Sequence, residues 1–359
     1  MTDPRPDNAS APSPTAAGRG ANRGAKRAAE RAPSARPRRA KGARRALNAA
    51  GSKAGAAAVK AAYMGGGYLT PHLAARAGAR LWCRLPHNEG RRKDNRPQPG
   101  RIEHVDIGGG RRLAVETWGE PDAPLVYLVH GWGGWRGQVA SFVPPLIASG
   151  YRAIAFDALS HGDSDPGEHG PRHSSGGELI ESLEAIARLN GPAAGAIGHS
   201  LGCAAICRAS LEGALDAQRL SLVAPNPDMG LYARLFGQRL GFPPPTIRLL
   251  ETAVVKWAHR GMADFDIASM GATGLLPDAL VIHDRADRES PYRVAQEIDR
   301  AWPNAQLMST QGHGHHRLLI APEVIEAATA NIFGWPPEPP EPPERQEPAE
   351  TPEPPEPQL

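Results

Sequence analysis

The amino-acid sequence predicts an α/β fold centred on a doubly wound, mostly parallel sheet of about eight strands. Between about residues 101 and 335, short apolar segments of strand length alternate with longer segments of helical periodicity. One short segment, Leu125–Val129, is apolar throughout, which is typical of a parallel strand covered on both faces. The chain of 359 residues, 40% of them hydrophobic, is long enough to bury such a core.

The elements of this region can be placed in chain order. Ile102–Ile107 and Leu113–Trp118 flank three glycines and predict a β-hairpin. The other predicted strands are Leu125–Val129, Tyr151–Phe156, Ala193–Ile197, Leu220–Ala224, Leu280–His283 and Gln306–Thr310. The predicted helices are Gln138–Ser149, Glu178–Leu189, the Ala-rich run Cys203–Ala209, a helix that begins at Ser290-Pro291, and Glu323–Phe333. Serine followed by proline is typical of a helix N-cap and first turn.

A segment of some fifty residues, 226–276, interrupts this alternation. It contains two helical patterns, Gly230–Leu240 and Thr246–His259, separated by three prolines. Insertions of this kind commonly cover the strand ends, so we expect a small helical lid. Its apolar residues favour a substrate with an acyl chain or another apolar group; they are Met229, Leu231, Leu235, Phe236, Leu249, Leu250, Val254 and Val255.

Two segments precede the α/β domain, which is predicted to span residues 101–335. Residues 1–45 have almost no large apolar side chain and are predicted to be a disordered basic tail. Residues 46–100 are predicted to be a helical segment and linker. An Ala-rich helix over 46–62 should end at Gly65-Gly66-Gly67, and a second helix should run from Thr70-Pro71 to about Trp82. We expect this helix to dock on the main domain; a membrane surface is the alternative.

Charge is concentrated at the two ends of the chain. Residues 1–50 contain twelve Lys and Arg against three acidic residues, whereas 336–359 contain seven glutamates against one arginine. The glutamates recur every third residue among eleven prolines, and this acidic tail is predicted to be disordered, with a polyproline II preference. The basic tail could bind polyanions weakly. Because no aromatic platform accompanies its charge, we expect no specific nucleic-acid binding.

The three cysteines, Cys83, Cys203 and Cys207, match neither a disulfide framework nor a C-x-x-C metal pair. We interpret them as core residues of a protein in a reducing compartment, and we expect a cytoplasmic location. The sequence contains no run of about 18 apolar residues, so no transmembrane segment is predicted. The histidines and carboxylates show no metal-ligand spacing, so neither a metal nor another cofactor is expected.

The most informative motif is Gly198-His199-Ser200-Leu201-Gly202, which lies between a predicted strand and a predicted helix. A serine at such a turn stands clear of the sheet and can act as a nucleophile. The glycines two positions before and after it allow close approach of the backbone. The alternative is that Ser200 only caps the helix.

A nucleophilic serine needs a histidine that accepts its proton and a carboxylate that orients the histidine. Both residue types follow later predicted strands: an aspartate within 284–287 and a histidine within 313–316. Because parallel strands end at the same edge of a sheet, these loops are predicted to meet Ser200.

The region 101–335 resembles the α/β-hydrolase family. Five motifs carry the resemblance in chain order: His130-Gly131-Trp132-Gly133-Gly134, Asp157-Ala158-Leu159-Ser160-His161-Gly162-Asp163-Ser164, the pentapeptide around Ser200, the loop after Ile282, and Gly314-His315. The family pattern G-x-x-D-x-x-x-P implies that Asp287 is the acid, with Asp284 where glycine is usual; either aspartate could instead pair with a nearby arginine. The family ending G-x-G-H-x-R implies His315 as the base, rather than His313 or His316.

The resemblance also implies an oxyanion hole formed by the backbone N–H groups of Trp132 and Leu201. His130, His161 and His199 would have structural roles. The expected activity is hydrolysis of a small-molecule carboxylic ester or thioester through an acyl-enzyme intermediate. Acyl transfer to an alcohol, or cofactor-free perhydrolysis, could use the same residues. The alternative from another class is a non-catalytic binding protein that acts through its charged tails.

Overall fold

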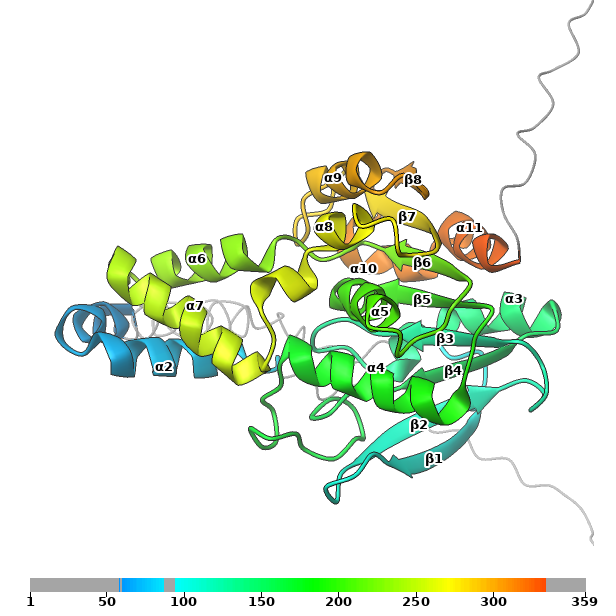
Figure 1. Ribbon diagram of the computed structural model, residues 1–359, viewed down its shortest axis with the longest axis horizontal. Coiled ribbons are helices and arrows are strands. Elements are labelled where there is room, and N and C mark those ends of the chain that lie inside the picture. The colour runs from blue at the N-terminus through cyan, green and yellow to red at the C-terminus, as the bar shows by residue number, and fades with distance from the viewer. Residues whose placement is uncertain (1–57, 59, 87–93, 334–359) are drawn as a thin grey trace, which may run out of the picture. The chain divides into compact units, whose positions relative to one another are not determined.

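The computed structural model describes residues 58, 60–86 and 94–333; the tails predicted at 1–45 and 336–359 lie outside the described residues. Eight strands form one sheet in the order β1-β2-β4-β3-β5-β6-β7-β8 (Figure 1). Strand β2 is antiparallel to β1 and β4, and the remaining neighbours are parallel. The strands are β1 Arg101–Asp106, β2 Arg112–Trp118, β3 Leu125–Val129, β4 Arg152–Phe156, β5 Gly195–His199, β6 Arg219–Val223, β7 Asp278–Asp284 and β8 Ala305–Thr310. This confirms the predicted fold class.

Helices cover both faces of the sheet. One group is α4 (Gly176–Asn190), α5 (Leu201–Leu211), α8 (Ile267–Gly271) and α9 (Arg293–Ala301); the other is α3 (Val143–Ala148) and α11 (Pro322–Ile332). Strand β3 is completely buried, and its side chains alternate between the two cores. Tyr127 and Val129 pack in the first core, whereas Val126 and Leu128 pack in the second.

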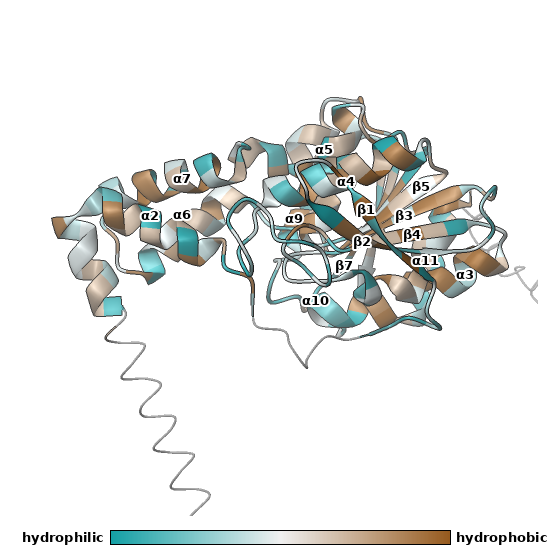
Figure 2. Ribbon diagram, turned by 90° about the horizontal axis from the view of Figure 1, so that it is seen from below, coloured by the Kyte–Doolittle hydropathy of each residue, from teal (hydrophilic) through white to brown (hydrophobic). Residues whose placement is uncertain are grey.

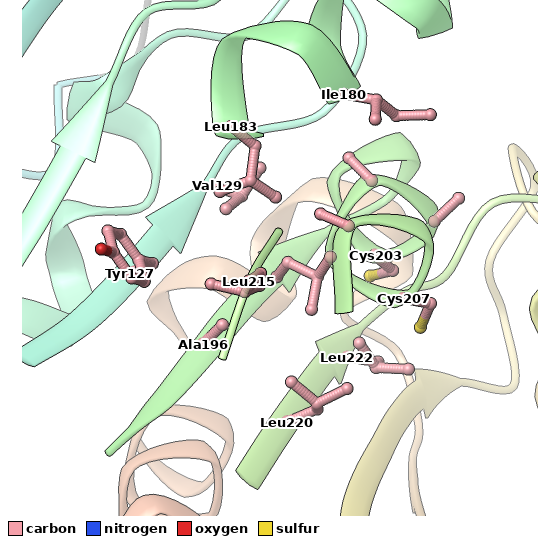
Figure 3. Close-up of a cluster of buried hydrophobic side chains, with 14 of the residues drawn as sticks. Tyr127, Val129, Ile180, Leu183, Ala196, Cys203, Cys207, Leu215, Leu220 and Leu222 are labelled. Carbon is pink, nitrogen blue, oxygen red and sulfur yellow. The ribbon is translucent and has the colours of Figure 1, made fainter. Parts of the chain in front are cut away.

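The first core contains two of the three cysteines (Figure 3). Cys203 and Cys207 lie on α5 and are completely buried among apolar side chains. Burial raises the pKa of both thiols, so they stay protonated. Their predicted position in the core is confirmed.

Several element boundaries differ from prediction. Strand β5 begins at Gly195, because Ala193 makes only an isolated bridge. The region predicted as one helix at 138–149 contains two short 3-10 turns followed by α3. Helix α9 begins at Arg293 and not at Ser290. Ser290 is instead buried, with its N–H bonded to Asp287 and its hydroxyl to the Pro225 carbonyl oxygen.

Three helices form a separate group beside the sheet: α2 (Pro71–Trp82), α6 (Met229–Arg239) and α7 (Pro244–Ala258) (Figures 1 and 2). Helix α2 packs along α7. Helices α6 and α7 belong to the segment 226–276 that the sequence predicts to be a lid. The preceding residues 60–69 are also helical, so the prediction that Gly65–Gly67 end this helix is wrong. Gly67 packs closely here, since a Cβ at this position would lie 3.0 Å from the Phe242 ring.

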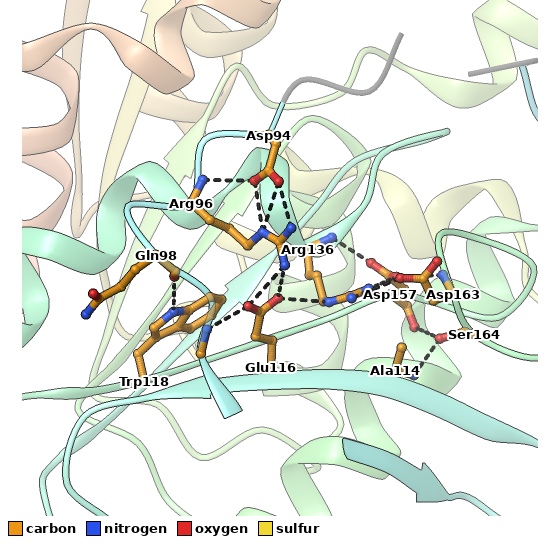
Figure 4. A network of polar contacts seen from close by, with 11 residues as sticks. Asp94, Arg96, Gln98, Ala114, Glu116, Trp118, Arg136, Asp157, Asp163 and Ser164 are labelled. Atoms are coloured by element: carbon orange, nitrogen blue, oxygen red, sulfur yellow. Dashed lines mark hydrogen bonds and ion pairs between the residues drawn. The ribbon is translucent and has the colours of Figure 1, made fainter. Parts of the chain in front are cut away.

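A buried ionic network fixes the loops that follow β3 and β4 (Figure 4). The Arg136 guanidinium contacts the completely buried carboxylates of Glu116 and Asp157, and Nε lies 3.0 Å from Glu116 Oε2. The Arg136 N–H also donates to Asp157 Oδ1 at 2.7 Å. Arg96 donates to Glu116, which ties the segment before β1 to the same network. Each buried charge therefore has a partner, as burial requires.

Candidate active site

Ser200 lies at a sharp turn between β5 and α5. Its backbone has φ 53° and ψ −121°, a conformation that costs a non-glycine residue strain. A Cβ at Gly202 would lie 2.6 Å from two backbone carbonyl oxygens, and one at Gly198 would lie 2.7 Å from the Ile206 side chain. Close approach of the strand, the helix and the neighbouring turn therefore accounts for the glycines on either side of the serine.

The Ser200 hydroxyl is not used to cap the helix. Ser200 occupies the N-cap position of α5, but its side chain makes no capping hydrogen bond. Its N–H donates to the Val223 carbonyl oxygen at 3.0 Å, which holds the turn against β6. The structure therefore does not support the interpretation of Ser200 as a simple helix cap.

The strain at Ser200 predicts a measurable stability difference. Ser200→Gly should be more stable than Ser200→Ala by about 1 kcal/mol, because glycine relieves strain of about 1–3 kcal/mol while increasing the entropy of the unfolded chain by about 0.4–1 kcal/mol. Both variants lack the hydroxyl, so their comparison isolates the backbone. Urea unfolding of the two variants measures the difference, and a glycine variant that is no more stable would contradict strain at this turn.

His315 and Asp287 form a direct hydrogen bond. His315 lies in the short helix α10 (Gly314–Arg317) after β8, and Asp287 lies in the loop after β7. His315 Nδ1 is 2.7 Å from Asp287 Oδ2, and both side chains are buried. A carboxylate accepts from Nδ1–H, so this contact assigns the proton to Nδ1 and leaves Nε2 as the acceptor nitrogen.

Asp287 is stabilised as an anion. Burial acts to raise the pKa of its carboxyl group, but hydrogen bonds from His283, His315 and the Ser290 N–H outweigh burial and hold this pKa well below its ordinary range. Oδ1 accepts the N–H groups of Glu289 and Ser290 at 2.8 and 2.9 Å. The loop therefore keeps one carboxylate oxygen occupied and directs the other at His315.

Asp284, the other candidate acid, holds the histidine loop from behind. Its carboxylate accepts the N–H groups of Gly312 and His313 and the Thr310 hydroxyl, at distances between 2.8 and 3.2 Å. It makes no recorded contact with the His315 ring. Burial acts to raise the Asp284 pKa, but these hydrogen bonds lower it to about 2. Asp284 therefore connects the ends of β7 and β8.

The lowered pKa of Asp284 predicts a pH-dependent contribution to stability. The pKa is about 2 in the folded protein against 3.8 for a free side chain, so the ionised group should contribute about 2 kcal/mol above pH 4. This contribution is lost as the pH falls through 2. Asp284→Asn should therefore lower the free energy of unfolding at pH 7, with a deficit that shrinks below pH 4. Denaturant unfolding measures it, with exposed Asp299→Asn as the control; a deficit independent of pH would contradict the ionic explanation.

Two of the predicted structural histidines fix the turn after β3. His130 Nδ1–H donates to the Gly131 carbonyl oxygen at 2.8 Å, and Nε2 accepts the Ala158 N–H at 3.0 Å. Burial lowers the His130 pKa to about 4, so the ring stays neutral. His161 Nε2 similarly accepts the Gly133 N–H at 3.2 Å. The two histidines bind the turns after β3 and β4 to each other.

Sequence reasoning missed two further histidine contacts at the site. His199 was predicted to have only a structural role. Its Nε2 atom is 3.1 Å from the His315 carbonyl oxygen, and the two rings are in contact. Burial lowers its pKa well below the ordinary value. His283 lies at the end of β7, with Nε2 3.4 Å from Asp287 Oδ2. Its position four residues before Asp287 was the only available sequence signal.

The remaining candidate histidines point to other partners. His313 Nε2 is 2.7 Å from Glu323 Oε1, and His316 Nε2 is 3.1 Å from Glu289 Oε1. Of the three histidines in this loop, His315 is thus the one that the structure joins to Asp287.

The two predicted oxyanion donors lie on either side of the Ser200 turn. Leu201 is the first residue of α5, and the N–H of a first helical residue has no acceptor within its helix. Trp132 lies in the turn after β3, which closely approaches the serine: a Cβ at Gly131 would lie 2.9 Å from Ser200 Cβ. Both residues therefore lie close to Ser200, where the sequence predicts an oxyanion hole.

A cavity of about 290 Å³ opens at this point. Trp132, Ser200, Leu201 and His315 all line it, while Asp287 lies behind His315. Much of the remaining wall is apolar; examples are Trp82, Met229, Val254, Met262 and Phe265. The structure thus brings the predicted site residues together, at the edge of the sheet where parallel strands end.

The described part of the chain contains neither a metal-binding cluster nor a membrane-spanning helix. Within residues 58, 60–86 and 94–333, no group of three or more His, Cys, Asp or Glu side chains is arranged to hold a metal ion. In the same residues, no helix is long and apolar enough to span a membrane.

Comparison with known proteins agrees with this fold. Residues 126–328 match the model of the alpha/beta hydrolase family. The chain belongs to this family of hydrolytic enzymes. It is 27% identical over 270 residues to a non-heme chloroperoxidase of Streptomyces lividans, covering 62% of this chain and 95% of that protein. It is 23% identical over 261 residues to a bifunctional esterase/perhydrolase of Acinetobacter calcoaceticus, covering 59% and 92%.

Solved structures show the same fold at lower sequence identity. Est1E from Butyrivibrio proteoclasticus, with ferulic acid bound, is 18% identical with a TM-score of 0.50, covering 64% of this chain and 99% of that one. A hydrolase from Pseudomonas aeruginosa PA01 is 19% identical with a TM-score of 0.50, covering 66% and 100%. At these identities, the comparison concerns the fold alone.

Proposed function

We propose that this protein is a serine hydrolase that cleaves a carboxylic ester or thioester through an acyl-enzyme intermediate. The observation that carries the proposal is the placement of His315, which is hydrogen-bonded to Asp287 and lines the same cavity as Ser200. Ser200 is strained and does not cap its helix. These features match the requirements of a Ser-His-Asp site.

The proposed reaction has two stages. Ser200 Oγ attacks the carbonyl carbon while His315 Nε2 takes the hydroxyl proton, and the N–H groups of Leu201 and Trp132 stabilise the resulting oxyanion. The carbon–oxygen or carbon–sulfur bond then breaks, and His315 gives the proton to the leaving alcohol or thiol. Water, deprotonated by His315, then attacks the acyl-Ser200 ester; the bond between the acyl carbon and Ser200 Oγ breaks, His315 returns the proton to Oγ, and the acid is released. Asp287 stays ionised and stabilises the charged imidazole of His315.

A fluorophosphonate probe and a panel of p-nitrophenyl esters test this proposal. The probe should modify one residue, identified as Ser200 by peptide mass spectrometry, and should block ester turnover in proportion to labelling. Asp287→Asn, which removes the carboxylate beside His315, serves as a control. The probe should label Ser200 of this variant much more slowly. No labelling and no turnover would contradict the proposal and favour a non-catalytic binding protein.

A second candidate activity is perhydrolysis, which the relationship to the Acinetobacter esterase/perhydrolase favours. Hydrogen peroxide would replace water in the second stage and attack acyl-Ser200, giving a peroxy acid without a redox cofactor. Incubation of an ester with the enzyme and hydrogen peroxide should then form peroxy acid at the expense of the free acid. An alcohol added in place of hydrogen peroxide tests acyl transfer, because a new ester should then form at the expense of the free acid. Release of free acid only, under both conditions, would restrict the activity to hydrolysis.

A further inference from the structure

We propose that helix α2 is part of the substrate site, and that Trp82 determines which acyl groups the enzyme accepts. This inference deepens the proposed function and rests on it for the nature of the substrate. Helix α2 precedes the region matched by the family model, which begins at residue 126. Even so, Trp82 and the adjacent Cys83 line the cavity that contains Ser200 and His315.

The position of Trp82 depends on contacts with both sides of the cavity. Its ring packs edge-on against Phe236 of α6, with ring centroids 5.3 Å apart. On the other side, the Cys83 carbonyl oxygen accepts the Ser174 N–H at 3.0 Å, and the Leu85 N–H donates to the Arg172 carbonyl oxygen at 2.9 Å. The end of α2 is therefore bonded to the loop immediately before α4.

The remainder of α2 is packed too closely against α7 to be an incidental addition. A Cβ at Gly78 would lie 3.0 Å from the Phe242 ring and 3.2 Å from the Leu250 side chain. Leu250 is completely buried, and Phe242 is 5% exposed, in a cluster that includes Ala75 and Ala79 of α2. Helix α2 thus covers the apolar face of the lid segment and connects it to the loop before α4.

The wall formed by Trp82 and Cys83 is apolar and unreactive. Burial, followed by the nearby Glu178 carboxylate, raises the Cys83 pKa to about 12, so the thiol stays protonated. Val254, Met262 and Phe265 also line the cavity. A volume of about 290 Å³ is at the lower end of small-molecule sites, which hold about 300–1,000 Å³. The chemistry fits an aliphatic or aryl acyl group of modest size.

The test compares Trp82→Ala with Leu73→Ala, a change on the same helix at a side chain that is 62% exposed and does not line the cavity. For each variant, kcat/KM is measured for p-nitrophenyl butyrate and decanoate. Trp82→Ala should raise the ratio of kcat/KM for decanoate to kcat/KM for butyrate by about tenfold. A difference of one methylene in an apolar pocket already changes kcat/KM by about 10-fold or more. Leu73→Ala should leave the ratio unchanged. Trp82→Phe, which can keep the contact with Phe236, should raise the ratio above the wild-type value by less than tenfold, and it serves as the test if Trp82→Ala does not fold.

The affinities for butanoate and decanoate, measured by calorimetry, supply a readout that does not depend on turnover. Trp82→Ala should shift the relative affinity for the two acids in the same direction as the kinetic ratio. Altered affinities without esterase activity in any variant would contradict the proposed reaction but support the role of Trp82 in the cavity. Wild-type turnover with ratios and affinities that Trp82→Ala and Trp82→Phe leave unchanged would overturn the inference.

Discussion

Ser200→Ala is expected to lower kcat for ester hydrolysis by about 10⁶-fold, which is the scale of removing the nucleophile from a serine hydrolase. The variant retains the cavity, the His315–Asp287 hydrogen bond and the proposed oxyanion donors. It loses only the oxygen atom that would form the acyl bond. Residual activity should therefore come from general-base attack by water and from oxyanion stabilisation, and no acyl-enzyme should accumulate.

The measurement is the rate of p-nitrophenol release together with intact-protein mass after substrate is added. Ser149→Ala is a matched control, since Ser149 is exposed at the end of α3 and does not line the cavity. The control should behave as the wild type. If Ser200→Ala kept most of its activity, another nucleophile would have to be sought and the proposed mechanism would be wrong.

Asp287→Asn is expected to lower kcat by about 10⁴-fold, as the corresponding change does in other Ser-His-Asp sites. An amide can donate a hydrogen bond to His315 Nδ1, which favours the tautomer with its proton on Nε2. That tautomer cannot accept the Ser200 proton. The side chain has nearly the same shape, so the folded structure and substrate binding should change little.

The matched comparison is Asp284→Asn, because Asp284 ends β7, Asp287 follows three residues later, and both are buried. Asp284 contacts the backbone of the histidine loop and not the His315 ring, so its replacement should reduce stability while lowering kcat far less than Asp287→Asn does. Because the pKa of each aspartate is lowered in the folded protein, both replacements should reduce stability; steady-state kinetics therefore distinguishes the two roles, and urea unfolding checks that each variant is folded in the assay. A larger kinetic loss in the Asp284 variant would reassign the acid.

Much of the fold was predictable from the sequence because each layer has a local signature. The continuously apolar segment 125–129 identified a strand buried on both faces, and the three glycines after Ile107 identified a hairpin. Element boundaries were less accurate. Gly65–Gly67 looked like a helix end but are helical, and Gly67 lies close to the Phe242 ring. Ser290-Pro291 looked like a helix start, but Ser290 is used by the Asp287 loop.

The order of residue types along the chain by itself determined the class of fold and narrowed the site to one serine, two aspartates and three histidines. Strand and helix periodicities are properties of neighbouring residues, and loops after parallel strands must share one edge of the sheet. The residues alone left Asp284 and Asp287 open and the family resemblance implied Asp287; only the tertiary structure shows that the Asp287 carboxylate contacts the His315 ring whereas that of Asp284 binds the backbone of the histidine loop. The contribution of α2 to the cavity was likewise decided by packing between segments about 150 residues apart, which no local pattern records.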